Sequence, residues 1–142
     1  MKAIPWNQKT IAEFNAKQGL GVGPWGDHVL LMTATGIHSG DEITTPLVYV
    51  REGDAYVITA SKGGAPKHPY WLANIKANPE IEVEVAADGG IAKFKARAKV
   101  VEDRAERDRL YDKLATVWPA FKDYEKRTDR LIPVVILERE GA

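Results

Sequence analysis

The sequence predicts an α+β domain that is mainly β, a small antiparallel barrel with helices attached. About six segments have the composition of strands, and closely spaced turn signals separate them. Residues 81–85 and 92–100 alternate apolar and charged side chains along their whole length, the pattern of strands with one buried face. Only about three segments are helical in pattern, so most strands follow another strand directly, and a doubly wound parallel sheet is disfavoured.

Composition bounds the class of protein. A chain of 142 residues is long enough for one domain whose core is stable without disulfides or structural metal ions. Its 20 basic and 20 acidic residues cancel, so net charge directs it neither to nucleic acid nor to an anionic membrane. The absence of cysteine excludes disulfides, thiolate metal sites and a cysteine nucleophile. No apolar run reaches transmembrane length and no signal peptide is recognised, so we expect a cytoplasmic protein.

Residues 1–24 are expected to precede the barrel domain, residues 25–142, as a lead-in. Residues 7–18 predict a short amphipathic helix with a Thr-x-x-Glu capping box that starts at Thr10. Such a helix packs on its own domain, covers a site, or contacts a membrane surface peripherally. Its few apolar positions favour packing on the domain. The glycine-rich segment 19–26 lacks a preceding strand and a following Gly-Lys-Ser/Thr, so a nucleotide-binding loop is disfavoured.

The strands are predicted in the order 28–35, 45–51, 55–61, 81–85, 92–100 and 133–137. The first three are separated only by turns, which predicts an antiparallel meander. The fourth and fifth predict a hairpin in which a row of bases on one strand faces Glu82 and Glu84 on the other. A basic row can bind nucleic acid, but its acidic partners indicate a solvated face instead.

Two further helices are predicted. Residues 69–77 open with a proline, whose missing N–H is tolerated in a first helical turn, and end before Pro79. Residues 102–118 carry apolar side chains at the spacing of one buried stripe. That stripe comprises Leu110, Leu114, Val117, Trp118 and Phe121. Pro119 interrupts the helix, and residues 121–126 continue it for another turn or two.

The stretch of residues 58–79 predicts a binding site. A strand ends at Ser61, the two glycines after Lys62 let the chain turn tightly, and a helix begins at Pro69. Backbone N–H groups, the Ser61 hydroxyl and the Lys62 ammonium therefore gather near a helix N-terminus, an arrangement that can hold an anion such as phosphate. Spacing alone leaves open the alternative of a surface loop with ordinary lysines.

Motifs of the common catalytic classes are absent from the sequence. The histidines His28, His38 and His68 do not have the spacing of metal ligands, so no metal site is predicted. Neither a Gly-x-Ser-x-Gly motif nor a distinct carboxylate pair suggests a hydrolase. Hydroxyl and cationic donors instead accompany many aromatic residues, which suits a planar anionic cofactor in an apolar cleft. The alternative is that aromatics such as Trp118 and Phe121 only fill the core.

Four segments together resemble the deazaflavin-dependent nitroreductase family of actinobacteria, the flavin-deazaflavin oxidoreductases A: residues 29–40, 44–50, 60–71 and 124–137. The most specific part is Ala-Ser-Lys-Gly-Gly followed by His-Pro-x-Trp. The resemblance implies a split β-barrel like that of the flavin-binding pyridoxamine-phosphate oxidases. It also implies coenzyme F-420, an 8-hydroxy-5-deazaflavin with a phosphate and a polyglutamate tail, and the reduction of quinones, enones or nitroimidazoles.

The family pattern implies cofactor-binding roles for residues in the first three segments and for Thr59, which directly precedes the third. These are His38, Ser39, Thr44, Thr45, Pro46, Thr59, Ala60, Ser61, Lys62, Lys67, His68, Pro69 and Trp71. The chain departs from the pattern at the turn where the family has Gly-Arg-Lys-Ser-Gly, because Ile37 and His38 replace the two bases. Ile43 replaces a further family base. This loss of fixed charge predicts weaker cofactor binding or a different anion, such as FMN.

The substrate-pocket tyrosines of the family correspond to Trp118, Phe121 and Tyr124. Only Tyr124 keeps a hydroxyl that can donate a proton, so it is the expected catalytic residue and nitroimidazole reduction is disfavoured. The resemblance implies an oxidoreductase that transfers a hydride from the reduced deazaflavin to a small electron-poor acceptor, a quinone or an α,β-unsaturated carbonyl. The alternatives are an FMN-binding oxidoreductase of the same fold and a non-catalytic carrier of a deazaflavin, haem-like or lipid ligand. A monomer or a homodimer is expected.

Overall fold

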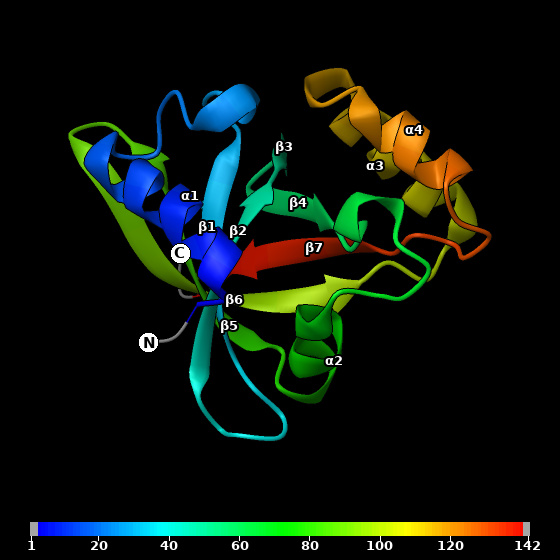
Figure 1. Ribbon diagram of the computed structural model, residues 1–142, viewed down its shortest axis with the longest axis horizontal. Coiled ribbons are helices and arrows are strands. Elements are labelled where there is room, and N and C mark those ends of the chain that lie inside the picture. The colour runs from blue at the N-terminus through cyan, green and yellow to red at the C-terminus, as the bar shows by residue number, and fades with distance from the viewer. Residues whose placement is uncertain (1–2, 141–142) are drawn as a thin grey trace.

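The computed structural model describes residues 3–140. In chain order its elements are α1 (Pro5–Ala16), η1 (Gly23–Trp25), β1 (Val29–Thr35), β2 (Glu42–Val48), β3 (Val50–Glu52), β4 (Ala55–Thr59), η2 (Lys62–Gly64), α2 (Tyr70–Ala77), β5 (Glu80–Ala87), β6 (Gly90–Val100), α3 (Arg104–Val117), α4 (Ala120–Lys126) and β7 (Val134–Arg139). The two η elements are short 3-10 turns. Figure 1 shows the strands gathered into one curled sheet with helices around it.

The curl of the sheet follows from how its edges are connected. The sheet has seven strands in the order β2-β1-β5-β6-β7-β4-β3, so β2 and β3 are its outer strands. The outer strands of a flat sheet of this width would lie roughly 30 Å apart. Only Tyr49 separates β2 from β3 in the chain. The sheet therefore has to curl until its two edges meet at Tyr49, whose N–H donates to the His28 carbonyl at 2.9 Å.

This connection confirms the predicted α+β barrel and corrects the strand count from six to seven. The predicted strand 45–51 divides at Tyr49, because its first part pairs with β1 and its second part pairs with β4. The predicted three-strand meander is therefore wrong. Its segments form two antiparallel hairpins that lie at opposite edges of the sheet.

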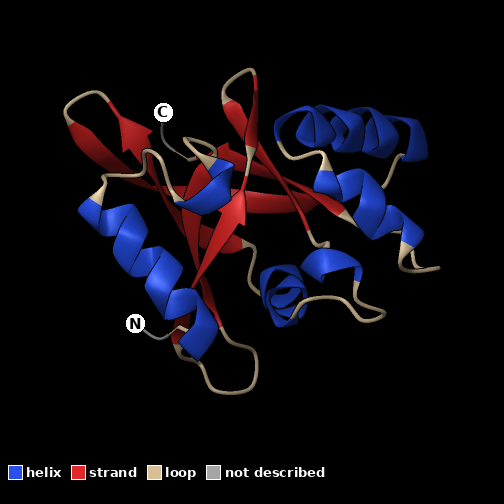
Figure 2. Cartoon of the chain, turned by 45° about the horizontal axis from the view of Figure 1, so that its top comes forward, coloured by secondary structure: helices blue, strands red, loops and turns tan. Residues whose placement is uncertain are grey.

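Side chains alternate between the barrel interior and two outer cores. On β1, Leu30 and Met32 face the interior, whereas Val29 and Leu31 pack with Phe14 of α1. Burial on both faces explains why the first predicted strand is a continuous apolar run. Figures 1 and 2 place α1 and the α3–α4 pair at opposite ends of the curled sheet.

The outer core under α3 and α4 contains the predicted helical stripe. Leu110 and Leu114 are fully buried there beside Val57 of β4, and Phe121 of α4 is 4% exposed. Tyr111 donates its hydroxyl to the Phe121 carbonyl at 2.5 Å, which joins the two helices where Pro119 interrupts them. None of the described helices combines the length and the apolar character that crossing a membrane requires.

The hairpin of β5 and β6 confirms the predicted solvated face. Glu82 lies opposite Lys95 and Glu84 opposite Lys93, and Lys93 also pairs with Glu82 at 3.2 Å. Exposed pairs of this kind stabilise a hairpin only weakly.

The predicted start of the first helix is wrong. α1 begins at Pro5 after Ile4, and no side chain caps it. A proline in the first turn sets the helical φ and lacks the N–H that a cap would satisfy. Thr10 therefore lies inside the helix instead of capping it.

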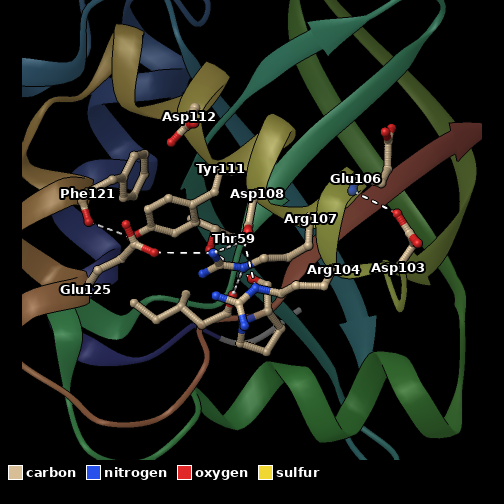
Figure 3. Close-up of polar contacts among 12 residues, drawn as sticks. Thr59, Asp103, Arg104, Glu106, Arg107, Asp108, Tyr111, Asp112, Phe121 and Glu125 are labelled. Atoms are coloured by element: carbon tan, nitrogen blue, oxygen red, sulfur yellow. Dashed lines mark hydrogen bonds and ion pairs between the residues drawn. The ribbon is translucent and has the colours of Figure 1, made fainter.

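Arg107 of α3 holds the C-terminal part of the fold together (Figure 3). Its side chain is 3% exposed, and its Nε donates to the carbonyl of Ile132 at 2.9 Å. Nη1 donates to Asp108 at 2.9 Å and to Glu125 of α4 at 3.2 Å. The guanidinium also lies 4.5 Å from the ring centroid of Tyr111. One arginine thus joins α3, α4 and the segment before β7.

We expect Arg107→Met to lower the free energy of unfolding by about 2–4 kcal/mol, because the buried Ile132 carbonyl and the Glu125 carboxylate lose their donor. Urea denaturation measures this change. Arg104→Met is the matched control, since Arg104 also pairs with Asp108 at 2.9 Å but is exposed. The control is expected to change stability by about 0.5 kcal/mol or less. Equal losses in the two variants would contradict the role of Arg107.

Candidate functional site

A cavity of about 410 Å³ lies between α1, the edge strand β2, η2, α2 and the junction of α3 with α4. Its lining comprises Ile4, Asn7, Thr10, Trp25, Val29, Thr45, Pro46, Leu47, Val48, Thr59, Ser61, Lys62, Gly63, Pro69, Tyr70, Trp71, Trp118, Phe121 and Tyr124. The lining combines hydroxyl, amide and ammonium groups with aromatic side chains. The cavity therefore suits a flat ligand with a polar or charged end.

Polar side chains of the cavity lining connect three elements. The hydroxyls of Thr45 on β2 and Tyr70 on α2 lie 2.5 Å apart. Asn7 of α1 also bonds to Tyr70, and burial raises the pKa of this phenol above its ordinary value. Tyr70 therefore stays protonated and ties α1 and β2 to α2 at the cavity wall.

The loop at Ser61, Lys62 and Gly63 forms a concave set of backbone N–H groups. Ser61 has right-handed angles, φ −76° and ψ −39°, whereas Lys62 and Gly63 have positive φ values of 46° and 62°. Successive right- and left-handed residues turn their N–H groups toward a common point, where an anion can bind. Within residues 3–140, these three N–H groups donate no hydrogen bond. These groups and the Lys62 side chain lie at the loop where the sequence predicts an anion site.

The conformation of Lys62 is strained. A left-handed backbone costs a residue with a Cβ atom about 1–2 kcal/mol. Such strain is retained where the surrounding structure imposes it, and it concentrates at functional sites. The position of Lys62 in the cavity wall agrees with this tendency.

Several aromatic residues of the cavity lining lie at or near the junction of α3 and α4. Trp25 meets Trp118 edge to face with ring centroids 6.1 Å apart. Phe121 meets Tyr124 in the same way at 5.8 Å. The indole N–H of Trp118 donates to the Tyr124 hydroxyl at 3.2 Å, so the hydroxyl keeps its own proton to donate. Trp118 and Phe121 belong to the outer core and also line the cavity, so their contribution to the core does not exclude a role in binding.

Ten of the residues implied by the family pattern line this cavity. They are Thr45, Pro46, Thr59, Ser61, Lys62, Pro69, Trp71, Trp118, Phe121 and Tyr124. The sequence did not predict that Ile4 before α1, or Asn7 and Thr10 within it, line the cavity, although Asn7 and Thr10 share a helix face by their spacing. α1 therefore packs on its domain, as predicted, and also forms part of the cavity wall.

The other six implied residues lie outside the cavity lining. Thr44 is fully buried and pairs with the Thr33 hydroxyl at 2.7 Å, and Ala60 is buried beneath the loop. His38 and Ser39 belong to the exposed turn between β1 and β2, where the Ser39 hydroxyl accepts the N–H of Asp41.

Lys67 and His68 follow the cavity loop as exposed residues. The ring of His68 lies 3.0 Å from Nη1 of Arg130. Arginine only donates hydrogen bonds, so Nδ1 of His68 accepts and the ring is neutral in this contact. Arg130 is a further residue that the sequence did not single out, and its partners in this loop lie 62 to 70 positions away in the chain.

Gly64 brings η2 against α4. Its φ is +80°, and a Cβ there would lie 2.6 Å from the Tyr124 carbonyl oxygen. We expect Gly64→Ala to cost about 3–4 kcal/mol of unfolding free energy, from the left-handed backbone and the clash combined. Gly53→Ala is the matched control, because Gly53 also has positive φ, +60°, but nothing lies within 4 Å of the added atom. It should cost only about 1–2 kcal/mol. Chemical denaturation tests the difference, and equal costs would contradict the clash.

Stability should also depend on the protonation of His68. Partial desolvation of the ring and the charge of Arg130 lower the pKa of His68 below its ordinary value of 6.5. His68 therefore binds a proton more readily in the unfolded chain than in the folded one. The free energy of unfolding consequently falls as the pH falls through this range. We expect the melting temperature to drop between about pH 7 and pH 5, and less steeply in His68→Gln, whose amide does not titrate. His38→Gln, at an exposed turn, is the control. A drop that His68→Gln leaves unchanged would contradict this assignment.

A family model for F420H2-dependent quinone reductases matches residues 6–139. An F420H2-dependent quinone reductase of Mycobacterium tuberculosis is 41% identical over 115 residues, which cover 78% of this chain and 72% of that protein. A putative F420H2-dependent quinone reductase of the same organism is 30% identical over 108 residues, 76% of this chain and 87% of that protein.

Solved structures also include an F420H2-dependent relative of this chain. An F420H2-dependent reductase, FDR-A, is 38% identical with a TM-score of 0.68, over 78% of this chain and 94% of that chain. A domain-swapped dimer is 34% identical with a TM-score of 0.70, over 94% of this chain and 96% of that chain. A putative pyridoxamine 5′-phosphate oxidase from Listeria innocua, 12% identical with a TM-score of 0.58 over 96% of this chain and 94% of that one, shares the fold, which confirms the expected barrel type. The chain belongs to the F420H2-dependent quinone reductase family, as the four segments of its sequence predict.

Proposed function

We propose that this chain is an oxidoreductase that uses reduced coenzyme F-420 to reduce a quinone, as the names of its relatives state for them. The observation that carries the proposal is the pairing, in one cavity, of a concave backbone anion site with aromatic walls. The anion site consists of Ser61, Lys62 and Gly63, and the walls include Trp118 and Phe121. A flat anionic cofactor and a flat apolar acceptor require these two surfaces.

The residues fit coenzyme F-420 in charge and shape. The free N–H groups of the loop and the Lys62 ammonium would hold anionic oxygens, while Trp71, Pro69 and Pro46 would contact the ring system. When bound, the reduced deazaflavin supplies a hydride from a ring carbon. Thr44 and Ala60 are buried outside the cavity lining, so they would contribute indirectly, by packing that fixes the position of β2 and of the loop.

Polar groups beyond the cavity would hold the rest of the cofactor. His38, Ser39, Lys67 and His68 lie on exposed turns outside the cavity lining. The turn that carries Ile37 and His38 is held to α2 by the Asn74 side chain, which accepts the Ile37 N–H at 3.1 Å. Replacement of two bases there would weaken contacts outside the cavity and leave the anion site at Ser61 and Lys62 intact.

Tyr124 is the proposed proton donor. Its hydroxyl accepts from Trp118, which holds the oxygen in place and leaves the proton available to an acceptor oxygen in the cavity. Trp25, Trp118 and Phe121 would exclude water from that side of the cavity. We further propose a cytoplasmic protein that forms a homodimer, because one related structure is a dimer.

Fluorescence titration with oxidised coenzyme F-420, with FMN in parallel, tests the cofactor. We expect micromolar or tighter binding of the deazaflavin alone. The Ser61→Ala, Lys62→Ala double variant should weaken it at least about tenfold, because a charge-assisted hydrogen bond contributes roughly 1.5–3 kcal/mol. Lys93→Ala, an exposed lysine on β6, is the control and should bind normally.

Other outcomes of this titration would overturn the proposal. Preference for FMN would make the chain a flavin enzyme of the same fold. Tight deazaflavin binding without reduction of any quinone in a broad panel would indicate a carrier. Full affinity in the double variant would exclude the Ser61 hydroxyl and the Lys62 ammonium as the groups that hold the anion.

A further inference from the structure

Arg130 lies between α4 and β7 and does not line the cavity, but its guanidinium contacts the cavity loop through all three nitrogens. Nη2 donates to the Ser61 carbonyl at 2.7 Å, and Nε donates to the Ala65 carbonyl at 2.8 Å. Nη1 donates to the Ala60 carbonyl at 3.1 Å and lies 3.0 Å from Nδ1 of His68. A planar fork of donors on one side chain thus spans residues 60–68.

These contacts determine where the N–H groups of the loop point. In a trans peptide unit the carbonyl and the N–H point in opposite directions. The carbonyls of Ala60 and Ser61 share their peptide units with the N–H groups of Ser61 and Lys62, and no peptide bond in the described chain is cis. Because Arg130 holds the two carbonyls on its own side, the two N–H groups are turned to the other side, where Ser61 and Lys62 line the cavity.

The same contacts account for the strained residue. Lys62 has a φ of 46°, and Arg130 bonds the carbonyls of Ser61 before it and Ala65 after it. A left-handed residue with a side chain needs such constraints on both sides to keep its conformation. Gly64 adds a third constraint, because its N–H donates to the Ser61 carbonyl at 2.9 Å.

We propose that Arg130 is the positioning residue of the cofactor site: it braces the loop of residues 60–65 so that the N–H groups of Ser61 and Lys62 are presented to an anionic oxygen of the cofactor. The inference deepens the proposed function and rests on it for the identity of the ligand. Arg130 acts through the loop and does not itself touch the ligand.

Arg130→Lys tests whether the hydrogen bonds of Arg130 hold the loop in place. The variant keeps the positive charge, but a single ammonium cannot span three carbonyls. We expect the Kd for oxidised coenzyme F-420 to rise at least about tenfold, which corresponds to 1.4 kcal/mol. The KM for the reduced cofactor should rise similarly, whereas kcat and the KM for a quinone should change less than about twofold. Arg130→Gln, which keeps two N–H donors without the charge, is measured in parallel and should behave alike.

Amide hydrogen exchange on the cofactor-free protein gives a reading that needs no ligand. Exchange of the hydrogen-bonded amides of this loop, those of Ala60, Gly64 and Ala65, should accelerate at least about tenfold in Arg130→Lys, with the rest of the chain unchanged. Arg104→Lys, an exposed arginine on α3, is the matched control and should alter neither exchange in this loop nor cofactor affinity.

Two results would overturn the inference. One is cofactor affinity in both Arg130 variants within about threefold of the wild type. The other is exchange that accelerates equally throughout the chain, which would show general destabilisation. If the wild type itself does not bind coenzyme F-420, the proposed function fails, and exchange in residues 60–65 of the cofactor-free variants still decides whether Arg130 braces the loop.

Discussion

The structure depends on one connection, the single residue that joins the two outer strands of the sheet. Tyr49 links β2 to β3, so a sheet of seven strands cannot lie flat. Its closure brings β2 near the end of β4, and the cavity lies along this seam. Residues of β2 from Thr45 to Val48 form one side of it, and Thr59 at the end of β4 contributes another part. The site is therefore a consequence of how the barrel closes.

Two arginines extend this constraint to the C-terminal half of the chain. Arg107 joins α3 to α4 and to Ile132, and Arg130 joins the following segment to the cavity loop. In both cases charged donors meet backbone carbonyls that β pairing leaves free, and such bonds stabilise more than neutral ones. α4, which carries Tyr124, and the α3–α4 junction, which carries Trp118, are thereby held at a set position relative to Ser61 and Lys62.

Charge in this protein acts locally. The chain has no net charge, and many of its bases are neutralised in surface pairs such as Lys93 with Glu82 and Lys99 with Glu138. At Glu52, hydrogen bonds from Arg109 and Lys113 hold the carboxyl pKa at about 2. The cavity loop instead combines a lysine with N–H groups that donate to nothing in the described chain. Recognition of an anion thus depends on the direction of the backbone N–H groups, and the net charge of the chain does not reveal this.

The sequence by itself determined the features that depend on neighbouring residues. Alternation at residues 81–85 and 92–100 predicted the hairpin, and the block that includes Ser61 and Trp71 predicted the family and the loop. Only the tertiary structure decided the division of strand 45–51 at Tyr49, because which edge a strand pairs with is set by the whole sheet. It also brought Asn7 to Tyr70 and Arg130 to Ser61, the latter pair 69 positions apart. Such contacts leave no local periodicity, since their partners meet only after the barrel has closed.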